Sequence, residues 1–247
     1  MEKVFGLIGQ TLSHSFSKSY FDEKFFRDGI KDHHYELFEI KNIEDFPQFI
    51  KDNPNLCGLN VTLPYKEKVM KFLDELDEQA KNIGAVNVIK INKGKLKGFN
   101  TDYIAFKNTL DRWIPEKKGL QALILGTGGS SKAIQQALKE LKIKFKTVSR
   151  EAGKGDYTYA ELEKDPSIIE KSKLIINATP MGMTPNTTTF PAIRYDLIGK
   201  DHYLYDLIYN PARTVFIQKA EMRDAHFKNG LEMLHEQAEN AWMIWNS

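Results

Sequence analysis

Leu120-Gln-Ala-Leu-Ile-Leu-Gly-Thr-Gly-Gly-Ser-Ser131 is the stretch of sequence that decides the fold. Its first six residues have the apolar character of a buried strand, and the residues from Ser130 to Leu141 have the apolar spacing of a helix. Glycines between a strand and a helix let the backbone approach a pyrophosphate, while the helix N-terminus offers N–H groups and a favourable dipole. The stretch therefore predicts a Rossmann-like dinucleotide site, with an ordinary strand-to-helix turn as the alternative.

Short apolar runs alternate with helical patterns on both sides of this stretch. Before it, we expect strands at 4–9, 34–40 and 56–61, helices at 19–28, 43–51 and 66–79, and a hairpin at 86–99. After it, we expect strands at 145–149, 173–177 and 202–206 and helices at 214–221 and 231–245. This alternation predicts an α/β protein whose second strand–helix unit begins after Pro115.

Length and composition restrict the class of protein. The 247 residues suffice for one large domain or two modest ones, and a net charge of +2 with scattered lysines offers no track for nucleic acid. The single cysteine, Cys57, has no partner for an internal disulfide, and no Cys/His spacing suggests a metal site. No run approaches the roughly 18 apolar residues of a membrane helix, and the N-terminus lacks a signal-peptide pattern. We expect a cytoplasmic protein without a nucleic-acid or membrane partner.

The end of the strand at 145–149 bears on the choice of cofactor. Enzymes that use NAD tend to place an acidic side chain there, which accepts from the ribose 2′-hydroxyl. This chain has Ser149 and Arg150 instead, with Lys154 close behind, and a guanidinium can clamp the 2′-phosphate of NADP. The pattern favours NADP. Two alternatives stay open: Glu151 could bind a ribose hydroxyl and repel a phosphate, or both cations could simply be solvated.

Two reactive side chains stand in the first half of the chain. Asn60-Val-Thr-Leu-Pro-Tyr-Lys66 places a lysine just past a predicted strand, and Asn100-Thr-Asp102 supplies a carboxylate. Hydride reduction of a ketone leaves an alkoxide that must be protonated, and a lysine ammonium is a compact proton donor. Asp102 could accept a substrate hydroxyl and hold the lysine in register. The alternative is a first-turn helix lysine and a helix-capping aspartate.

Hydroxyl and amide side chains gather after the predicted strands. Helix capping alone does not account for so many of them, so we predict a pocket for a ligand with several hydroxyl groups and a carboxylate. The side chains are those of Ser13, Ser15, Ser17, Asn60, Thr62, Asn87, Asn100 and Thr101.

Eight motifs in this chain resemble, in order, those of the shikimate dehydrogenase family. Together they extend over almost the whole sequence, which makes the resemblance far more specific than any one motif. They are Ser13-His-Ser-Phe-Ser17, Asn60-Val-Thr-Leu-Pro-Tyr-Lys66, Gly84-Ala-Val-Asn87, Asn100-Thr-Asp102, Gly126-Thr-Gly-Gly-Ser-Ser131, Asn177-Ala-Thr-Pro-Met-Gly182, Tyr205-Asp-Leu-Ile-Tyr-Asn-Pro211 and Gly230-Leu-Glu-Met-Leu-His-Glu-Gln-Ala238.

The resemblance implies a fold and a reaction. The fold has two α/β domains with the active site in the cleft between them: a substrate domain of residues 1–102, completed by the C-terminal helix at 226–247, and a Rossmann-like NADP-binding domain of residues 103–225. The implied reaction is the reversible, NADPH-dependent reduction of 3-dehydroshikimate to shikimate, on the route to chorismate and the aromatic amino acids. The implied partners are small molecules, and the protein would be a monomer or a homodimer.

The resemblance also assigns roles to individual residues. Lys66 and Asp102 would be the catalytic pair. The substrate carboxylate would contact Ser15 and Ser17, with Tyr209 nearby. The ring hydroxyls would contact Thr62, Asn87 and Gln237, and Asn60 would support these residues. NADP would contact Gly126, Gly128, Gly129 and Ser130 at the pyrophosphate, Ser149, Arg150 and Lys154 at the 2′-phosphate, and Thr179, Leu207 and Gly230 at the adenosine or nicotinamide end.

The chain departs from the family pattern at a few positions. Lys18 replaces a proline, Phe21 stands near the place of a histidine, Tyr103 replaces a glycine, and the Asn-Arg-Thr clamp reads Ser149-Arg-Glu151. The catalytic pair is untouched by these changes, whereas the cofactor preference is affected. The alternatives are therefore a quinate/shikimate dehydrogenase, a relative that uses NAD, and a non-catalytic paralogue that binds shikimate.

Overall fold

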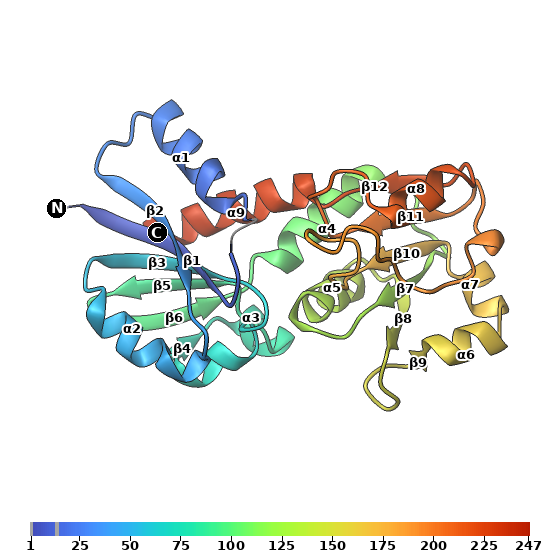
Figure 1. The fold of residues 1–247 in the computed structure, drawn as a ribbon, viewed down its shortest axis with the longest axis horizontal. Helices are drawn as coiled ribbons and strands as arrows, with labels where there is room; N and C mark the ends of the chain where they lie inside the picture. The colour runs from blue at the N-terminus through green and yellow to red at the C-terminus, as the bar shows by residue number, and fades with distance from the viewer. Residues whose placement is uncertain (1, 13–14) are drawn as a thin grey trace. The chain divides into compact units, whose positions relative to one another are not determined.

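The computed structural model describes residues 2–12 and 15–247, and it divides into two compact units. Unit 1 comprises Met1–Asp102 and His235–Ser247, and unit 2 comprises Tyr103–Leu234. Each unit has a six-stranded sheet with helices, so the predicted α/β class is confirmed (Figure 1). Residues 226–234, which the sequence leads us to expect in the first domain, belong to unit 2 because β12 (His226–Lys228) pairs with β11 (Tyr203–Asp206) in the second sheet.

The sheet of unit 1 has the strand order β2-β1-β3-β5-β6-β4. The central strands β1 and β3 are parallel to each other and to β2, whereas β5 runs antiparallel to both of its neighbours. Gly58 in β3 lies beneath the ring of Trp245, which leaves no room for a larger side chain at this position. The strands are β1 (Lys3–Gly9), β2 (His33–Glu39), β3 (Leu56–Val61), β4 (Glu75–Leu76), β5 (Val88–Asn92) and β6 (Lys95–Phe99).

Helices cover both faces of this sheet because β1 presents apolar side chains alternately to each side. Phe5 and Leu7 pack in one core with α1 (Ser17–Arg27) and the end of α9 (Leu231–Asn246). Ile8 packs in the other core, with η1 (Ile43–Asp45), α2 (Phe46–Asp52), η2 (Lys68–Phe72) and α3 (Glu78–Ile83). Unit 1 is therefore a three-layer α/β/α structure.

The prediction of a helix at 66–79 is wrong. In its place the chain forms η2, the short strand β4 and then α3, which begins at Glu78. Asp74 explains the break: its backbone N–H donates to the carbonyl of Leu96, and its Oδ2 accepts from the Leu96 N–H. The pairing of β4 with β6 therefore overrides the local preference for a helix.

The sheet of unit 2 is parallel throughout, in the order β12-β11-β10-β7-β8-β9. This is the doubly wound arrangement, whose order reverses between β7 and β10, and ligands of such sheets bind at the carboxyl ends of the two strands that flank the reversal. The strands not yet introduced are β7 (Gln121–Leu125), β8 (Lys144–Ser149), β9 (Tyr157–Thr158) and β10 (Leu174–Asn177).

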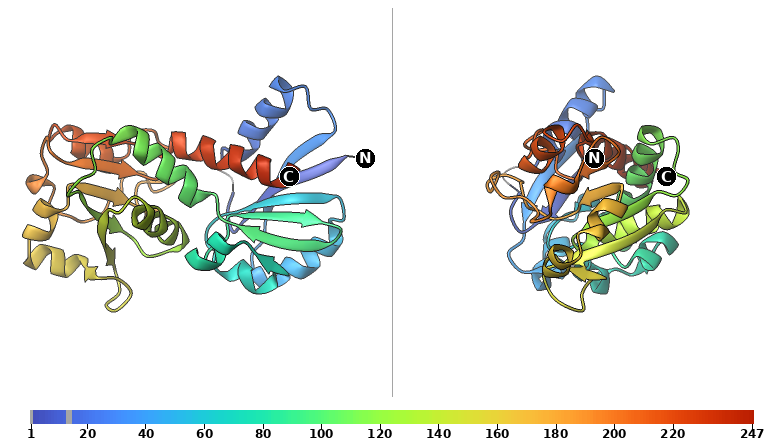
Figure 2. Two further views of the ribbon diagram at one scale, coloured as in Figure 1. Left: turned by 180° about the vertical axis from the view of Figure 1, so that it is seen from behind. Right: turned by 90° about the vertical axis from the view of Figure 1, so that its right-hand side faces the viewer.

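Two apolar cores lie on the two faces of the second sheet. Helices α4 (Asp102–Trp113) and α5 (Gly129–Glu140) pack side by side on one face (Figures 1 and 2). The other face carries α6 (Tyr159–Lys164), α7 (Ser167–Lys171), η3 (Tyr195–Leu197) and α8 (Val215–Glu221). The apolar patterns of the sequence do not indicate α4, α6, α7, η3, β9 or β12. Within the part of the chain that the structure describes, no helix combines the length and apolar character needed to cross a bilayer.

Candidate active site

One edge of the unit 1 sheet collects most of the polar side chains that the sequence singled out. Strands β1 and β3 end at this edge, β6 also ends there, and the antiparallel strand β5 begins there. Thr62 and Lys66 follow β3, Asn87 precedes β5, and Asp102 follows β6. Open α/β sheets bind their ligands at the carboxyl ends of the parallel strands.

Lys66 and Asp102 form an ion pair at this edge. Lys66 Nζ lies 2.6 Å from Asp102 Oδ2, and the two side chains are 13% and 7% exposed. The other carboxylate oxygen, Oδ1, accepts from Asn87 Nδ2 at 2.9 Å, which fixes the orientation of the carboxylate. An ammonium held beside an oriented carboxylate can donate a proton to a ligand oxygen, and the resulting amine can then be protonated again.

Asn87 is the centre of this polar network. Its amide nitrogen also donates to Thr101 Oγ1 at 3.0 Å and to Gln237 Oε1 at 3.4 Å, and its Oδ1 accepts from the Thr101 N–H at 2.7 Å. Thr101 Oγ1 in turn donates to the backbone carbonyl of Gln237. The structure thus brings together Lys66, Asp102, Asn87 and Gln237 of the predicted site. It adds Thr101, which the sequence analysis had counted among the polar side chains without giving it a role.

Ser15 and Ser17 lie where β1 leads into α1. The N–H of Ser17, the first residue of α1, donates to Ser15 Oγ at 3.2 Å. The N–H of Ser15 donates to the carbonyl of Leu12, and both serines are half-buried. Ser13, also predicted for this cluster, lies outside the described residues. The serine hydroxyls stand at the N-terminus of a helix, where an anionic group is favoured.

Asn60, Thr62 and Asn100 support the same edge. Asn60 is buried in β3, and its Oδ1 accepts from the hydroxyl of Tyr35 at 2.7 Å. Thr62 is half-buried at the end of β3, and Asn100 Nδ2 donates to the carbonyl of Ala85. No role at the site was predicted for Tyr35. The signal that could have revealed its polar contact is the choice of tyrosine over phenylalanine at a fully buried position.

The glycine loop of unit 2 has the geometry of a phosphate cradle. Gly126 follows β7 with a φ of +112°, and a Cβ there would lie 3.0 Å from the carbonyl oxygen of Ala178. Gly128 caps α5, which begins at Gly129 and continues through Ser130, and a Cβ on Gly128 would point into open space. The loop therefore leaves room for a ligand against the N-terminus of a helix of 12 residues. These residues fit the pyrophosphate of a dinucleotide.

The end of β8 carries the candidate clamp for a 2′-phosphate. Ser149 is buried, its Oγ accepts from the Glu151 N–H at 3.1 Å, and Arg150 beside it is exposed. Lys154 Nζ lies 2.7 Å from Glu151 Oε2, and both side chains are more than half exposed. The hydrogen bond from Lys154 lowers the pKa of Glu151. The acid that the sequence analysis identified as a complication is thus paired with one of the two predicted phosphate-binding cations.

The loop after β10 faces the glycine loop across the reversal of strand order. Thr179 is fixed by Asn177, whose Oδ1 accepts from both the Thr179 N–H and its hydroxyl. Gly230 lies against Leu207: a Cβ on Gly230 would lie 2.1 Å from the Leu207 carbonyl oxygen, so no larger residue fits. Tyr209, predicted to contact substrate, is half-buried after β11 and belongs to unit 2.

Asp206 is a buried carboxyl that the sequence analysis left without a role. It accepts from Thr214 Oγ1 at 2.5 Å, Asn177 Nδ2 at 3.0 Å and the Ile208 N–H at 3.1 Å. It therefore connects the ends of β10 and β11 to the N-terminal cap of α8, which is Thr214. Burial raises the pKa of Asp206 to about 6, because the three hydrogen bonds offset only part of the cost of desolvating the charge.

Comparison with known proteins places the chain in a family. Residues 7–89 match the family described as shikimate dehydrogenase substrate binding domain. A shikimate dehydrogenase (NADP(+)) of Clostridium perfringens is 39% identical over an alignment of 258 positions, which covers 99% of this chain and 92% of that relative.

Solved structures agree with this placement. A shikimate dehydrogenase 1 from Peptoclostridium difficile superimposes with a TM-score of 0.88 at 36% identity, covering 99% of this chain and 91% of that one. A shikimate 5-dehydrogenase from Thermus thermophilus, in complex with NADP(H) and shikimate, gives a TM-score of 0.84 at 28% identity and covers 98% and 93% of the two chains. The similarity extends over both units rather than over the substrate domain alone, and the chain accordingly belongs to the shikimate dehydrogenase family.

Proposed function

We propose that this protein is a shikimate dehydrogenase that catalyses the reversible, NADPH-dependent reduction of 3-dehydroshikimate to shikimate. The observation that carries the proposal is the Lys66–Asp102 pair at 2.6 Å, oriented by Asn87, at the ligand-binding edge of the unit 1 sheet. Membership of the shikimate dehydrogenase family supports oxidation and reduction of shikimate as the reaction that this pair serves. The product belongs to the route to chorismate and the aromatic amino acids.

Lys66 supplies the proton. A bound NADPH would supply hydride to the carbonyl carbon of the substrate, so that negative charge develops on the carbonyl oxygen. The Lys66 ammonium protonates that oxygen as the charge develops, which leaves a neutral amine. In the reverse direction the neutral amine takes the proton from the substrate hydroxyl as hydride departs. Asp102 holds Lys66 in place and accepts a hydrogen bond from a substrate hydroxyl.

The other polar residues of unit 1 hold the substrate. Ser15 and Ser17 would donate to its carboxylate at the N-terminus of α1, where an anion is favoured. Thr62, Asn87 and Gln237 would reach the ring hydroxyls, with Asn60 in support behind them. Tyr209 of unit 2 would contribute near the substrate carboxylate.

Unit 2 holds the cofactor. Gly126, Gly128, Gly129 and Ser130 would cradle the pyrophosphate, because Gly128 leaves open space at the start of α5. Gly126 has to be a glycine, since a Cβ there would crowd the neighbouring loop. Ser149, Arg150 and Lys154 would bind the 2′-phosphate, where the Arg150 guanidinium can donate two parallel hydrogen bonds. The residues proposed for the adenosine or nicotinamide end are Thr179, Leu207 and Gly230. We further propose that the enzyme is cytoplasmic and acts as a monomer or homodimer on small molecules.

The test is the reduction of nicotinamide by the purified protein with shikimate, followed by absorbance in the near ultraviolet. Rapid reduction of NADP, and little of NAD, is the expected result. Preference for NAD would keep the reaction but overturn the assignment of Arg150 and Lys154 as the clamp. Faster turnover with quinate than with shikimate would change the substrate. Binding of shikimate without any reduction would make the protein a non-catalytic member of the family.

A further inference from the structure

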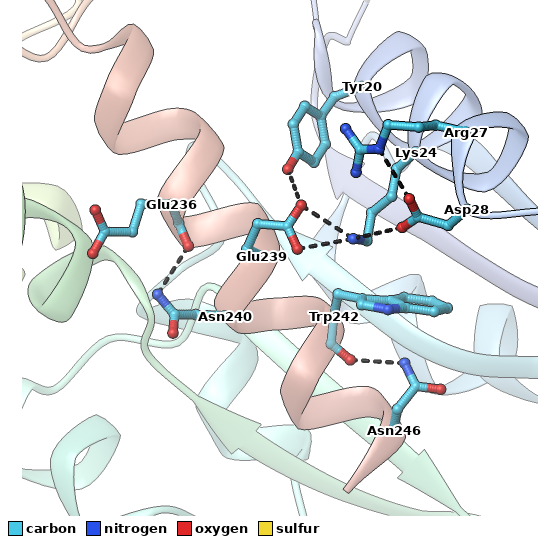
Figure 3. Close-up of polar contacts among 9 residues, drawn as sticks. All are labelled: Tyr20, Lys24, Arg27, Asp28, Glu236, Glu239, Asn240, Trp242 and Asn246. Carbon is cyan, nitrogen blue, oxygen red and sulfur yellow. Dashed lines mark hydrogen bonds and ion pairs between the residues drawn. The ribbon is translucent and has the colours of Figure 1, made fainter.

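A charged cluster centred on the buried Lys24 connects helices α1 and α9 in unit 1, with the Glu239 side chain 41% exposed (Figure 3). Lys24 Nζ lies 3.1 and 2.9 Å from the two carboxylate oxygens of Glu239 and 3.1 Å from Asp28 Oδ2. The hydroxyl of Tyr20 donates to Glu239 Oε1. The Lys24 ammonium also lies 5.9 Å from the centroid of the Trp242 ring, and its side chain is only 7% exposed. Glu239 therefore receives hydrogen bonds from two residues of α1.

The cluster is charged although Lys24 is buried. Burial opposes the ionisation of Glu239, but the hydrogen bonds from Tyr20 and Lys24 outweigh it and leave the pKa of this carboxyl below its ordinary value. Burial likewise opposes the charge of Lys24, but its hydrogen bonds to Glu239 and Asp28 outweigh that effect and raise the pKa of Lys24. A buried ion pair adds little stability over an apolar pair of similar volume, because desolvation cancels most of the attraction. What it does supply is directional hydrogen bonding, which fixes one helix against another.

The two helices that it joins both carry proposed substrate-binding residues. On α1, Tyr20 and Lys24 lie one and two turns after Ser17, on the same face of the helix. On α9, Glu239 follows Gln237 by two residues, so their side chains point about 200° apart around the helix axis. Helix α9 is thus held on one side by α1 and on the other by the contacts of Gln237 with Asn87 and Thr101.

We propose that Glu239 is a positioning residue that, through Lys24 and Tyr20, sets the placement of Gln237 relative to Ser17 across the substrate site. The inference rests on the proposed function, because it takes Ser17 as a ligand of the substrate carboxylate and Gln237 as a ligand of a ring hydroxyl. Glu239 itself contacts no substrate. Rotation or sliding of α9 would misplace Gln237 and weaken substrate binding, whereas Lys66 and Asp102 lie on other elements and keep their own ion pair.

The first test is the steady-state kinetics of Glu239→Gln, a substitution that keeps the size of the side chain and removes its charge. The KM for shikimate is expected to rise about five- to tenfold. Both kcat and the KM for NADP should stay within about twofold of the wild type. Tyr20→Phe, which deletes a single hydroxyl, should raise the shikimate KM about two- to threefold. This milder substitution keeps the proposal testable if Glu239→Gln fails to fold. Glu140→Gln is the matched control: it breaks the half-buried 2.7 Å ion pair with Lys107 in unit 2 and should leave the shikimate KM unchanged.

A double variant separates positioning from stability. Lys24→Met with Glu239→Met replaces the ion pair by an apolar pair, which restores stability but has no directional bonds. We expect a melting temperature near that of the wild type together with a raised KM for shikimate. A wild-type KM in the double variant, an unchanged KM in Glu239→Gln, or equal increases in the KM for shikimate and NADP would each overturn the proposal. A wild-type protein that does not oxidise shikimate would instead overturn the proposed function.

Discussion

Lys66 and Asp102 are joined by one carboxylate oxygen, whereas the second oxygen of Asp102 is bound by Asn87. Lys66 Nζ donates to Oδ2 across 2.6 Å, and Asn87 Nδ2 donates to Oδ1 across 2.9 Å. The carboxylate is thus fixed from the side opposite to the lysine. Asp102 therefore orients the ammonium without having to move, and a substrate oxygen can approach a proton donor whose direction is already set.

Replacing Lys66 should abolish most turnover while preserving substrate binding. We expect Lys66→Ala to lower kcat by about 10²- to 10⁴-fold, because it removes the proton donor of the chemical step. The affinity for shikimate should stay within a few-fold of the wild type when measured by calorimetry. Lys68→Ala, at an exposed lysine two residues further on, is the control and should retain activity. A Lys66→Ala enzyme with unchanged kcat would remove Lys66 from the mechanism.

Asn87 should matter for both stability and activity. Asn87→Ala leaves the buried N–H of Thr101 without its acceptor and frees the Asp102 carboxylate to rotate. We expect a loss of about 2–3 kcal/mol in the free energy of unfolding, measured by urea denaturation, together with a fall in kcat. Asn240→Ala removes only a bond to the Glu236 carbonyl within α9, and it should change both quantities little. Equal effects of the two substitutions would contradict the role of Asn87 as the centre of the network.

The strands of four or more residues were predictable because most are apolar runs whose burial dominates their local preferences, whereas β4, β9 and β12, with two or three residues each, are too short to show such a pattern. Val4 to Gly9 and Leu120 to Leu125 are examples, and the glycines after the second run also indicated the start of α5. The helix expected at 66–79 failed for the opposite reason. Asp74 is bound by Leu96, a partner 22 residues away, and no local pattern reveals such a pairing.

The candidate site was predictable in its residue types but not in its contacts. Lys66 and Asp102 could be singled out because each follows an apolar strand with polar neighbours. The bond between Asn87 and Gln237 joins residues 150 positions apart in the chain, and the role of Thr101 depends on that same convergence. The pairing of β3, β5 and β6 and the packing of α9 against the sheet, both set by contacts far apart in the chain, bring these side chains together.

Removing the acid beside the 2′-phosphate clamp should improve the use of NADP. Glu151 holds Lys154 in an exposed ion pair, so Glu151→Thr frees the ammonium for a phosphate and removes a repelling charge. We expect kcat/KM for NADP to rise about two- to fivefold, with kcat/KM for NAD unchanged. Glu163→Thr, at an exposed position on α6, is the control. A fall in kcat/KM for NAD would show that Glu151 binds the ribose hydroxyls instead.

Asp206 should make the protein less stable as the pH rises through the weakly acidic range. Its pKa is about 6 in the folded protein, against 3.8 for an ordinary aspartate, because the carboxyl is buried. Between these two values the folded state binds more protons than the unfolded state, so the free energy of unfolding contributed by this group falls as the pH rises. The loss should approach about 3 kcal/mol once the pH exceeds the folded-state pKa.

Asp206→Asn isolates this contribution from that of the other carboxyl groups. Asn177 and the Ile208 N–H can still donate to the amide oxygen, and the Thr214 hydroxyl can rotate to accept from the amide nitrogen. Groups such as Glu239 and Asp156, whose pKa values are lowered, lose their stabilising contribution as the pH falls, equally in both proteins. The difference in unfolding free energy, variant minus wild type, should therefore rise by about 2 kcal/mol from pH 4 to pH 7. A difference independent of pH would show that Asp206 ionises as an ordinary aspartate does.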